Sequence, residues 1–231
     1  RTNFVQVVPA GIAPSLNGVW GIIRPSVQPG WNLMSPPLFV NDLAFNGALG
    51  AMLTNGLTGG GSHATSDQIH AFDSSGIPYM LWLNSSAGVW YEGGSPTTRS
   101  LDPGQGFMIY RQGLATNEPF VGKAGNYGDQ TVTLAGGRWN LIGLSQGGAV
   151  SGNPIPGTLL SGTPIASYAF NAADRITFKH TDGSWKIYQR FGDNTWRDLD
   201  APGTPATITM HPGDGYYYYR QSSGGTMTVG F

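Results

Sequence analysis

The 231-residue chain contains no cysteine, so it can form neither a disulfide nor a thiolate metal site. Charge is also scarce: charged residues make up 11% of the chain, against about 25% in an average soluble protein, and the formal net charge is −1. The 12 Lys and Arg residues are spread over the whole sequence. Because binding a phosphate backbone needs clustered basic side chains, nucleic acid is not expected as a partner.

A long apolar segment is missing as well. The longest mostly apolar stretch, around residues 43–57, is interrupted by Asn46, Gly47, Gly50 and Asn55. This stretch is too short to cross a bilayer. The chain is therefore not expected to span a membrane.

No reactive group stands in a recognisable catalytic context. Residues 143–147 match the Gly-x-Ser-x-Gly nucleophile elbow, which requires a helix directly after the serine. Gly148, Pro154 and Pro156 follow instead and prevent a regular helix. Ser145 is therefore not expected to be catalytic.

Residues that bind metals lack the spacing of ligands. The histidines, at positions 63, 70, 180 and 211, form no His-Glu-x-x-His pattern. Asp193, Asp198 and Asp200 are close in sequence but lack the regular alternation and the bidentate glutamate of an EF-hand, which favours a solvated turn. The sequence predicts no cofactor, no metal site and no enzyme; a hydrolase is the weakest hypothesis.

What the chain does contain is turn and strand chemistry. It has 36 glycines and 16 prolines, together with 12% aromatic residues. Short β-branched and aromatic runs alternate with Gly, Pro, Asn and Asp, which is typical of strands joined by tight turns. This composition predicts an all-β protein.

An internal repeat organises these strands. Residues 101–113 and 210–222 share a Pro-Gly-x-Gly turn, an aromatic run and an Arg-Gln pair. The Trp-Asn-Leu triplet at 31–33 recurs at 139–141. Each copy is domain-sized. The sequence therefore predicts two tandem duplicated small β-sandwich or barrel-like domains, residues 17–124 and 125–231, after an N-terminal extension, residues 1–16.

One segment of the first domain breaks the strand pattern. Phe45, Leu49, Met52 and Leu53 follow helical spacing, with Asn41 or Asp42 available as an N-cap and Gly56 near the end. These residues predict one short helix in the first domain. Its counterpart in the second domain, residues 152–161, contains two prolines and is expected to be a loop or a single turn.

The N-terminal extension reads as an additional strand. Phe4, Val5, Val7 and Val8 form an apolar, β-branched run followed by Pro9. Such a strand either pairs with its own sheet or adds to the open edge of a neighbouring subunit. The sequence leaves both alternatives open.

The aromatic residues divide into core and surface candidates. Trp90 and Trp196 stand at the same position of the repeat and are expected to anchor the two cores. Trp82 and Tyr91 have no equally clear counterparts and are the candidates for a surface that contacts glycans or other subunits. Four consecutive tyrosines, 216–219, cannot all be buried without partners for their hydroxyls, so at least one face of this strand is expected to be amphipathic. That face, with Tyr217 and Tyr219 as its possible contacts, is expected to form an interdomain surface, a subunit interface or a glycan platform.

The motif order resembles a large family of exported bacterial proteins common in Verrucomicrobia-like genomes. The resemblance lies in the Pro-Gly-Trp-Asn-Leu block at 29–33, Trp90, and the Pro-Gly-Gln-Gly-Phe block at 103–107. It implies a secreted or surface-attached β-domain protein and no established catalysis. The chain begins at Arg1, which agrees with a secretion signal that has been removed.

Together these features predict a non-enzymatic extracellular or cell-surface structural protein. Its subunits would assemble with each other into a fibre, sheath or layer, because the domains are low in charge and carry an extra strand. The alternative is a carbohydrate-binding or adhesion module that contacts surface glycans through Trp82, Tyr91, Tyr217 and Tyr219.

Overall fold

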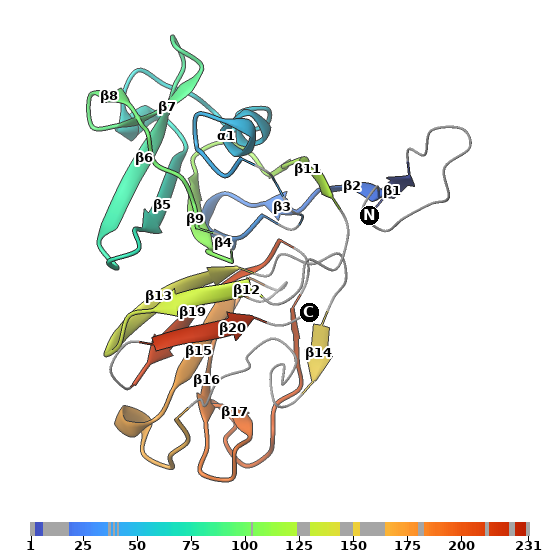
Figure 1. Cartoon of the computed structure of the whole chain (residues 1–231), viewed down its shortest axis with the longest axis vertical. Helices are drawn as coiled ribbons and strands as arrows, with labels where there is room; N and C mark the ends of the chain where they lie inside the picture. Colours follow the sequence, from blue (N-terminus) through green and yellow to red (C-terminus); the bar gives the residue numbers. More distant parts are fainter. Residues whose placement is uncertain are drawn as a thin grey trace.

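The computed structural model confirms an all-β protein with one short α-helix (Figure 1). It describes residues 3–6, 19–36, 38, 40, 42–102, 104–123, 130–143, 150–152, 165–179, 183–210, 213–221 and 225–229. The expected boundaries at 16/17 and 124/125 lie outside these residues. Below, residues 19–123 are called the first half and residues 130–229 the second half.

Each half is built around one large antiparallel sheet. The sheet of the first half has the order β4 (Gly30–Met34), β9 (Phe107–Arg111), β5 (Gln68–Phe72), β6 (Pro78–Asn84), β7 (Val89–Glu92), β8 (Ser95–Pro96). The sheet of the second half has the order β13 (Arg138–Gly143), β19 (Gly215–Arg220), β15 (Arg175–Lys179), β16 (Trp185–Arg190), β17 (Trp196–Asp198). The first five strands of the sheet in the first half correspond, in order across the sheet, to the five strands of the sheet in the second half. This agreement supports the predicted duplication, which stays an inference from the sequence repeat.

The described part of the chain also contains four smaller sheets. Their strands are β1 (Asn3–Gln6), β2 (Val19–Ile23) and β11 (Phe120–Lys123); β3 (Ser26–Val27) and β10 (Thr116–Asn117); β12 (Gln130–Leu134) and β20 (Gly225–Val229); β14 (Val150–Gly152) and β18 (Ile208–Met210). Among the described residues, two short 3-10 helices, η2 (His63–Thr65) and η3 (Phe170–Ala172), lie in loops.

The predicted helix is present as α1 (Ala48–Leu53). Asp42 stabilises its start, because the two carboxylate oxygens accept hydrogen bonds from the amides of Ala44 and Ala48, at 2.9 and 3.0 Å. These bonds lower the pKa of the Asp42 carboxyl. Leu49 and Leu53 are fully buried and close one face of the first sheet. The expected loop counterpart lies outside the described residues, apart from Gly152.

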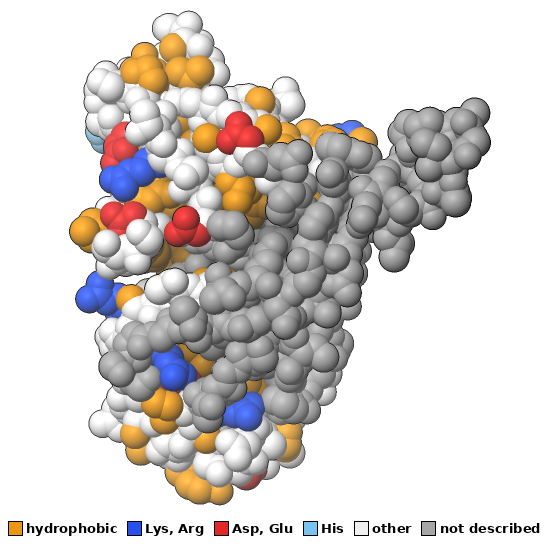
Figure 2. All heavy atoms as spheres, in the orientation of Figure 1, with side chains coloured by type: hydrophobic (Ala, Val, Ile, Leu, Met, Phe, Trp, Pro, Cys, Tyr) orange, Lys and Arg blue, Asp and Glu red, His pale blue; other side chains and the backbone are white. Residues whose placement is uncertain are grey.

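Each half has its own hydrophobic core, and the repeated tryptophans lie inside. Trp90 and Trp196 are both 0% exposed, which confirms the prediction that they are core anchors. Ile69, Leu81 and Ile109 surround the first core, and Ile176, Tyr188 and Tyr218 the second. No helix among the described residues is long and apolar enough to cross a membrane. On the face shown in Figure 2, described side chains of both charges are scattered singly or in small groups.

Repeated polar residues tie the strands of each sheet together. The fully buried carboxylate of Asp67 pairs with Arg111 and accepts the amide of Gln112 at 2.7 Å. In the second half, Asp174 pairs with Arg220 at 2.7 Å and accepts the amide of Gln221 at 2.8 Å. In sheet order, each aspartate directly precedes the third strand (β5 or β15) and each arginine ends the second (β9 or β19). The ion pair therefore fixes the alignment of these two neighbouring strands.

A junction of reciprocal contacts joins the two halves. The amide of Ser35 donates to the carbonyl of Gly213 at 2.9 Å, and the amide of Gly143 donates to the carbonyl of Gly104 at 2.8 Å. Ser35 and Gly143 occupy the same position of the repeat, as do Gly104 and Gly213. Such reciprocity is the pattern of a two-fold interface, here within one chain. The repeated Pro-Gly-x-Gly turn therefore holds the halves together as well as starting a strand.

The second glycine of that motif allows the close approach. A methyl group on Gly215 would lie 2.5 Å from the carbonyl oxygen and 2.8 Å from the amide nitrogen of Met34. We expect Gly215→Ala to lower the free energy of unfolding by about 1–3 kcal/mol, because backbone atoms cannot move aside cheaply. Urea unfolding measures the change, and Gly203→Ala is the control, since a methyl group there meets nothing within 4 Å. Equal stability of the two variants would contradict this role of the junction.

Candidate interaction surfaces

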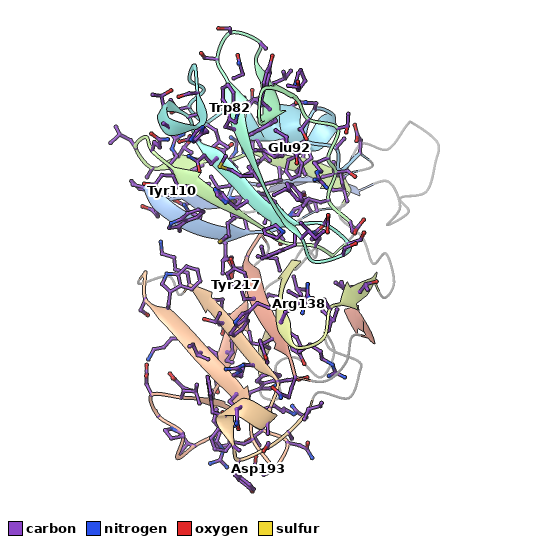
Figure 3. All side chains as sticks on the ribbon, turned by 90° about the vertical axis from the view of Figure 1, so that its left-hand side faces the viewer. Trp82, Glu92, Tyr110, Arg138, Asp193 and Tyr217 are labelled. Carbon is purple, nitrogen blue, oxygen red and sulfur yellow. The ribbon has the colours of Figure 1, made fainter. Side chains whose placement is uncertain are left out.

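One row of side chains crosses the first large sheet on the face opposite α1. Cross-strand pairing aligns Trp31 with Tyr110, Tyr110 with Gln68, Gln68 with Trp82, and Trp82 with Tyr91. Partners in a strand register project from the same face, so these five side chains line up across five strands. We call this side of the two large sheets the open face. Figure 3 labels Trp82 and Tyr110 on it.

The rings of this row are not equally accessible. Trp31 is 40% exposed, and its ring contacts those of Tyr110 and His70, at centroid distances of 4.9 and 4.8 Å. Trp82 is only 7% exposed, contacts the ring of Tyr91 at 5.2 Å and donates its indole N–H to the carbonyl of Gly93 at 3.0 Å. The prediction that Trp82 lies at the surface is therefore wrong, because a neighbouring ring and a turn cover the indole. Tyr91 is half-buried.

Trp31, which belongs to the repeated Trp-Asn-Leu triplet, is not among the surface residues that the sequence predicts. In the structure the asparagine of the triplet has the structural role, because it holds the turn before its strand. The side-chain amide of Asn32 donates to the carbonyls of Gln28 and Gly30, at 2.7 and 2.9 Å, and that of Asn140 donates to the equivalent turn. The tryptophan before it is left on the open face.

The four consecutive tyrosines divide between the core and the open face, as strand alternation predicts. Tyr216 and Tyr218 are buried, and the Tyr218 hydroxyl donates to Asp174 at 2.6 Å. Tyr217 reaches the other half: its hydroxyl donates to the sulfur of Met108 at 2.8 Å, and burial raises its pKa to about 12. Figure 3 shows Tyr217 at the junction. The partner met by Tyr217 is thus the first half of the same chain.

Tyr219 remains on the open face of the second sheet with Trp139, at a ring distance of 5.3 Å. Register aligns Trp139, Tyr219, Arg175, Gln189 and Arg197 in a row that matches the row of the first half. The position of Gln68 is thus taken by Arg175. Because Tyr217 contacts Met108, the two rows lie on adjoining surfaces.

The N-terminal strand is the other predicted surface. In the structure β1 pairs with β2 in antiparallel register, from Asn3 opposite Ile22 to Gln6 opposite Val19. This strand contains Phe4 and Val5, whereas Val7 and Val8 lie outside the described residues. Figure 1 shows β1 and β2 projecting away from the two large sheets. The pairing in this structure is the one within the chain.

The described polar clusters have structural roles. Asp193 accepts the amide and hydroxyl of Thr195 and pairs with Arg197; these contacts lower its pKa to about 2. Asp198 and Asp200 pair with Lys186, at 3.3 and 2.9 Å. No group of three potential metal ligands occurs in the described residues. Ser145, His180 and His211 lie outside them.

Comparisons with protein-family models, with curated proteins and with solved structures find no match for this chain. The resemblance to exported bacterial proteins stays an expectation from the sequence. The function has to be argued from the two surfaces described above.

Proposed function

We propose that the protein is a non-enzymatic, extracellular structural protein whose subunits assemble by exchanging the N-terminal strand. The observation that carries the proposal is the position of β1, which pairs with β2 at the end of a projecting sheet, away from both large sheets (Figure 1). β1 is the edge strand of the three-stranded sheet β1-β2-β11, and an edge strand offers main-chain groups to which another strand can add. An apolar strand in this position gains stability when a second subunit packs against it.

Exchange would cost little because the same main-chain bonds form within or between chains. Residues 7–18 join β1 to β2, and a segment of this length spans up to about 40 Å when extended, enough to reach a neighbour. The net charge of −1 leaves little repulsion between subunits. A secreted or surface location is what the resemblance implies, and it is part of the proposal.

Introduced cysteines test the exchange directly, since the native chain contains none. Asn3 and Ile22 are register partners, so their Cα atoms lie within the range that a disulfide can bridge. We mix an Asn3→Cys chain with an Ile22→Cys chain under oxidising conditions. Exchange predicts a disulfide between the two different chains, detected by mass spectrometry. Asn3→Cys mixed with Val19→Cys is the control, because Val19 pairs with Gln6 at the other end of the strand.

Deletion of residues 1–12 gives an independent readout. The truncated chain should fold with unchanged near-UV circular dichroism yet sediment as a monomer, while the full chain forms larger species. Filaments of the truncated chain in electron micrographs would rule out strand exchange. A full chain that stays monomeric at high concentration would rule out assembly altogether.

The alternative, a carbohydrate-binding or adhesion module, is favoured by a different observation. The aromatic row of the first sheet presents the half-exposed ring of Trp31 between His70 and Tyr110. Aromatic rings with polar neighbours suit the apolar faces of sugar rings. This alternative does not depend on β1, so the truncated chain should keep any glycan affinity.

A further inference from the structure

Arg175 lies among three aromatic rings on the open face of the second sheet. Its guanidinium carbon lies 4.1 Å from the ring centres of Phe170 and Tyr219 and 5.5 Å from that of Trp139. A planar guanidinium stacks well on such rings, which hold it in one orientation. Phe170 is itself 47% exposed, so the cluster reaches the surface.

This guanidinium has cation–π neighbours but no acceptor among the described residues. Its Nε is buried without a hydrogen-bond partner there. Arg99, Arg111, Arg197 and Arg220, by contrast, each pair with a carboxylate. This Nε–H is removed from water without an acceptor, which is unfavourable, and the guanidinium carries four further N–H donors. The arrangement is suited to an acceptor that comes from another molecule.

A second cation extends the same face. Lys179 lies four residues further along β15, about 13 Å from Arg175 along the strand. It donates to the carbonyl of Trp31 at 3.0 Å, and its register partner is Trp185. Trp31 and Trp185 are 40% and 44% exposed. Each cation is therefore accompanied by accessible aromatic rings.

The charge on the open face has one sign. At the described strand positions on this face the charged residues are Arg175, Lys179 and Arg197, and Arg197 is neutralised by Asp193. The positions of Arg175 and Lys179 are occupied in the first half by Gln68 and Phe72. The cationic character thus belongs to the second half alone, at residues that the two copies do not share.

We propose that the open face of the second sheet binds an acidic polysaccharide. Arg175 receives the carboxylate of a uronate residue in a forked, charge-assisted hydrogen bond, while Trp139 and Tyr219 contact the sugar rings. Lys179, with Trp31 and Trp185, contacts the polymer further along β15. The rings stacked on Arg175, together with the exposed Trp31 and Trp185 near Lys179, favour sugars over an acidic peptide. This site is independent of strand exchange.

Binding of the full chain to polygalacturonate, measured by titration calorimetry and by affinity electrophoresis, tests the proposal. Neutral dextran is the reference polymer. We expect binding to polygalacturonate that weakens as salt is raised, and no binding to dextran. Arg175→Gln, which introduces the side chain found at the equivalent Gln68, should weaken binding about tenfold or more. Arg175→Lys keeps the charge without the forked geometry, so it should retain only part of the native affinity.

Lys186→Gln is the matched control, since it removes one cation that already pairs with Asp198 and Asp200. It should bind as the native chain does, and thermal unfolding should show Arg175→Gln folded. Equal binding of dextran, no binding of polygalacturonate, or equal losses in Arg175→Gln and Lys186→Gln would each overturn the proposal. So would loss of self-association in Arg175→Gln without any polyuronate binding, which would identify an interface between subunits.

Discussion

Arg111→Met is expected to lower the free energy of unfolding by about 3–5 kcal/mol. The reason is that the substitution leaves the buried carboxylate of Asp67 without its cation. Asp67 is 0% exposed and Arg111 is 8% exposed, so removing the cation leaves an uncompensated carboxylate in the interior. The amides of Thr58 and Gln112 still donate to Asp67, at 2.6 and 2.7 Å, but they carry no full charge. Urea unfolding followed by tryptophan fluorescence measures the loss.

A matched exposed pair provides the control. Arg99 bonds to Glu92 at 3.0 Å, but about a third of each side chain remains in water. Arg99→Met should therefore cost less than about 1 kcal/mol. The double variant Asp67→Asn/Arg111→Met should recover part of the stability lost by Arg111→Met, because the uncompensated charge of Asp67 is then absent. Equal losses for Arg99→Met and Arg111→Met would show that Asp67 has solvent or another partner.

Glu118→Gln is expected to remove a pH dependence of stability. Glu118 is 1% exposed, and neither carboxylate oxygen has a hydrogen-bond partner in the described residues. Burial raises its pKa to about 7, Arg111 opposes the rise and Asp67 adds to it. The folded state therefore holds this proton up to a higher pH than the unfolded state, whose glutamate ionises near 4.3.

The sign follows from linkage. Protonated Glu118 contributes stability in full below about pH 4, and that contribution is lost as pH rises through 7. The loss can reach about 3 kcal/mol at pH 8. Glu118→Gln should remove this loss and be more stable than the native chain at pH 8. Burial lowers the pKa of His70, so its contribution to stability changes with pH in the opposite direction.

The measurement is the difference between the unfolding free energies of the two proteins from pH 4 to pH 9. Taking the difference cancels His70 and isolates Glu118. A difference that does not change with pH would show that the pKa of Glu118 is not raised in the folded state. Glu118 lies in the first half, so Glu118→Gln should not change the stability of the second half. The second half is therefore an internal reference if the two halves unfold in separate transitions.

The repeated and the unrepeated residues have different roles in this molecule. Asp67 and Asp174, with their arginines, align strands within each half. Gly104 and Gly213 join the halves through reciprocal bonds. The residues at which the copies differ, Arg175 in place of Gln68 above all, give the open face its charge. Architecture and proposed recognition are therefore carried by separate sets of positions.

The amino-acid sequence by itself determined the all-β class, the short helix at Ala48–Leu53 and the burial of Trp90 and Trp196. These features depend on local spacing and composition, which can be read along the chain. Alternation also predicted which tyrosines of the run at 216–219 share a face. It left open whether Tyr217 meets the other domain, another subunit or a glycan, because that choice depends on how the two sheets meet.

The open face was decided by the tertiary structure alone. A period of two tells which residues of one strand share a face, but not which strands are neighbours. The order β4-β9-β5-β6-β7 brings Trp31, Tyr110 and Trp82 into one row although they lie far apart in sequence. The pairing of β6 with β7 places Tyr91 beside the buried Trp82, and the matching order β13-β19-β15 in the second sheet places Arg175 beside Tyr219. Strand order results from packing two cores and one junction, and no local pattern encodes it.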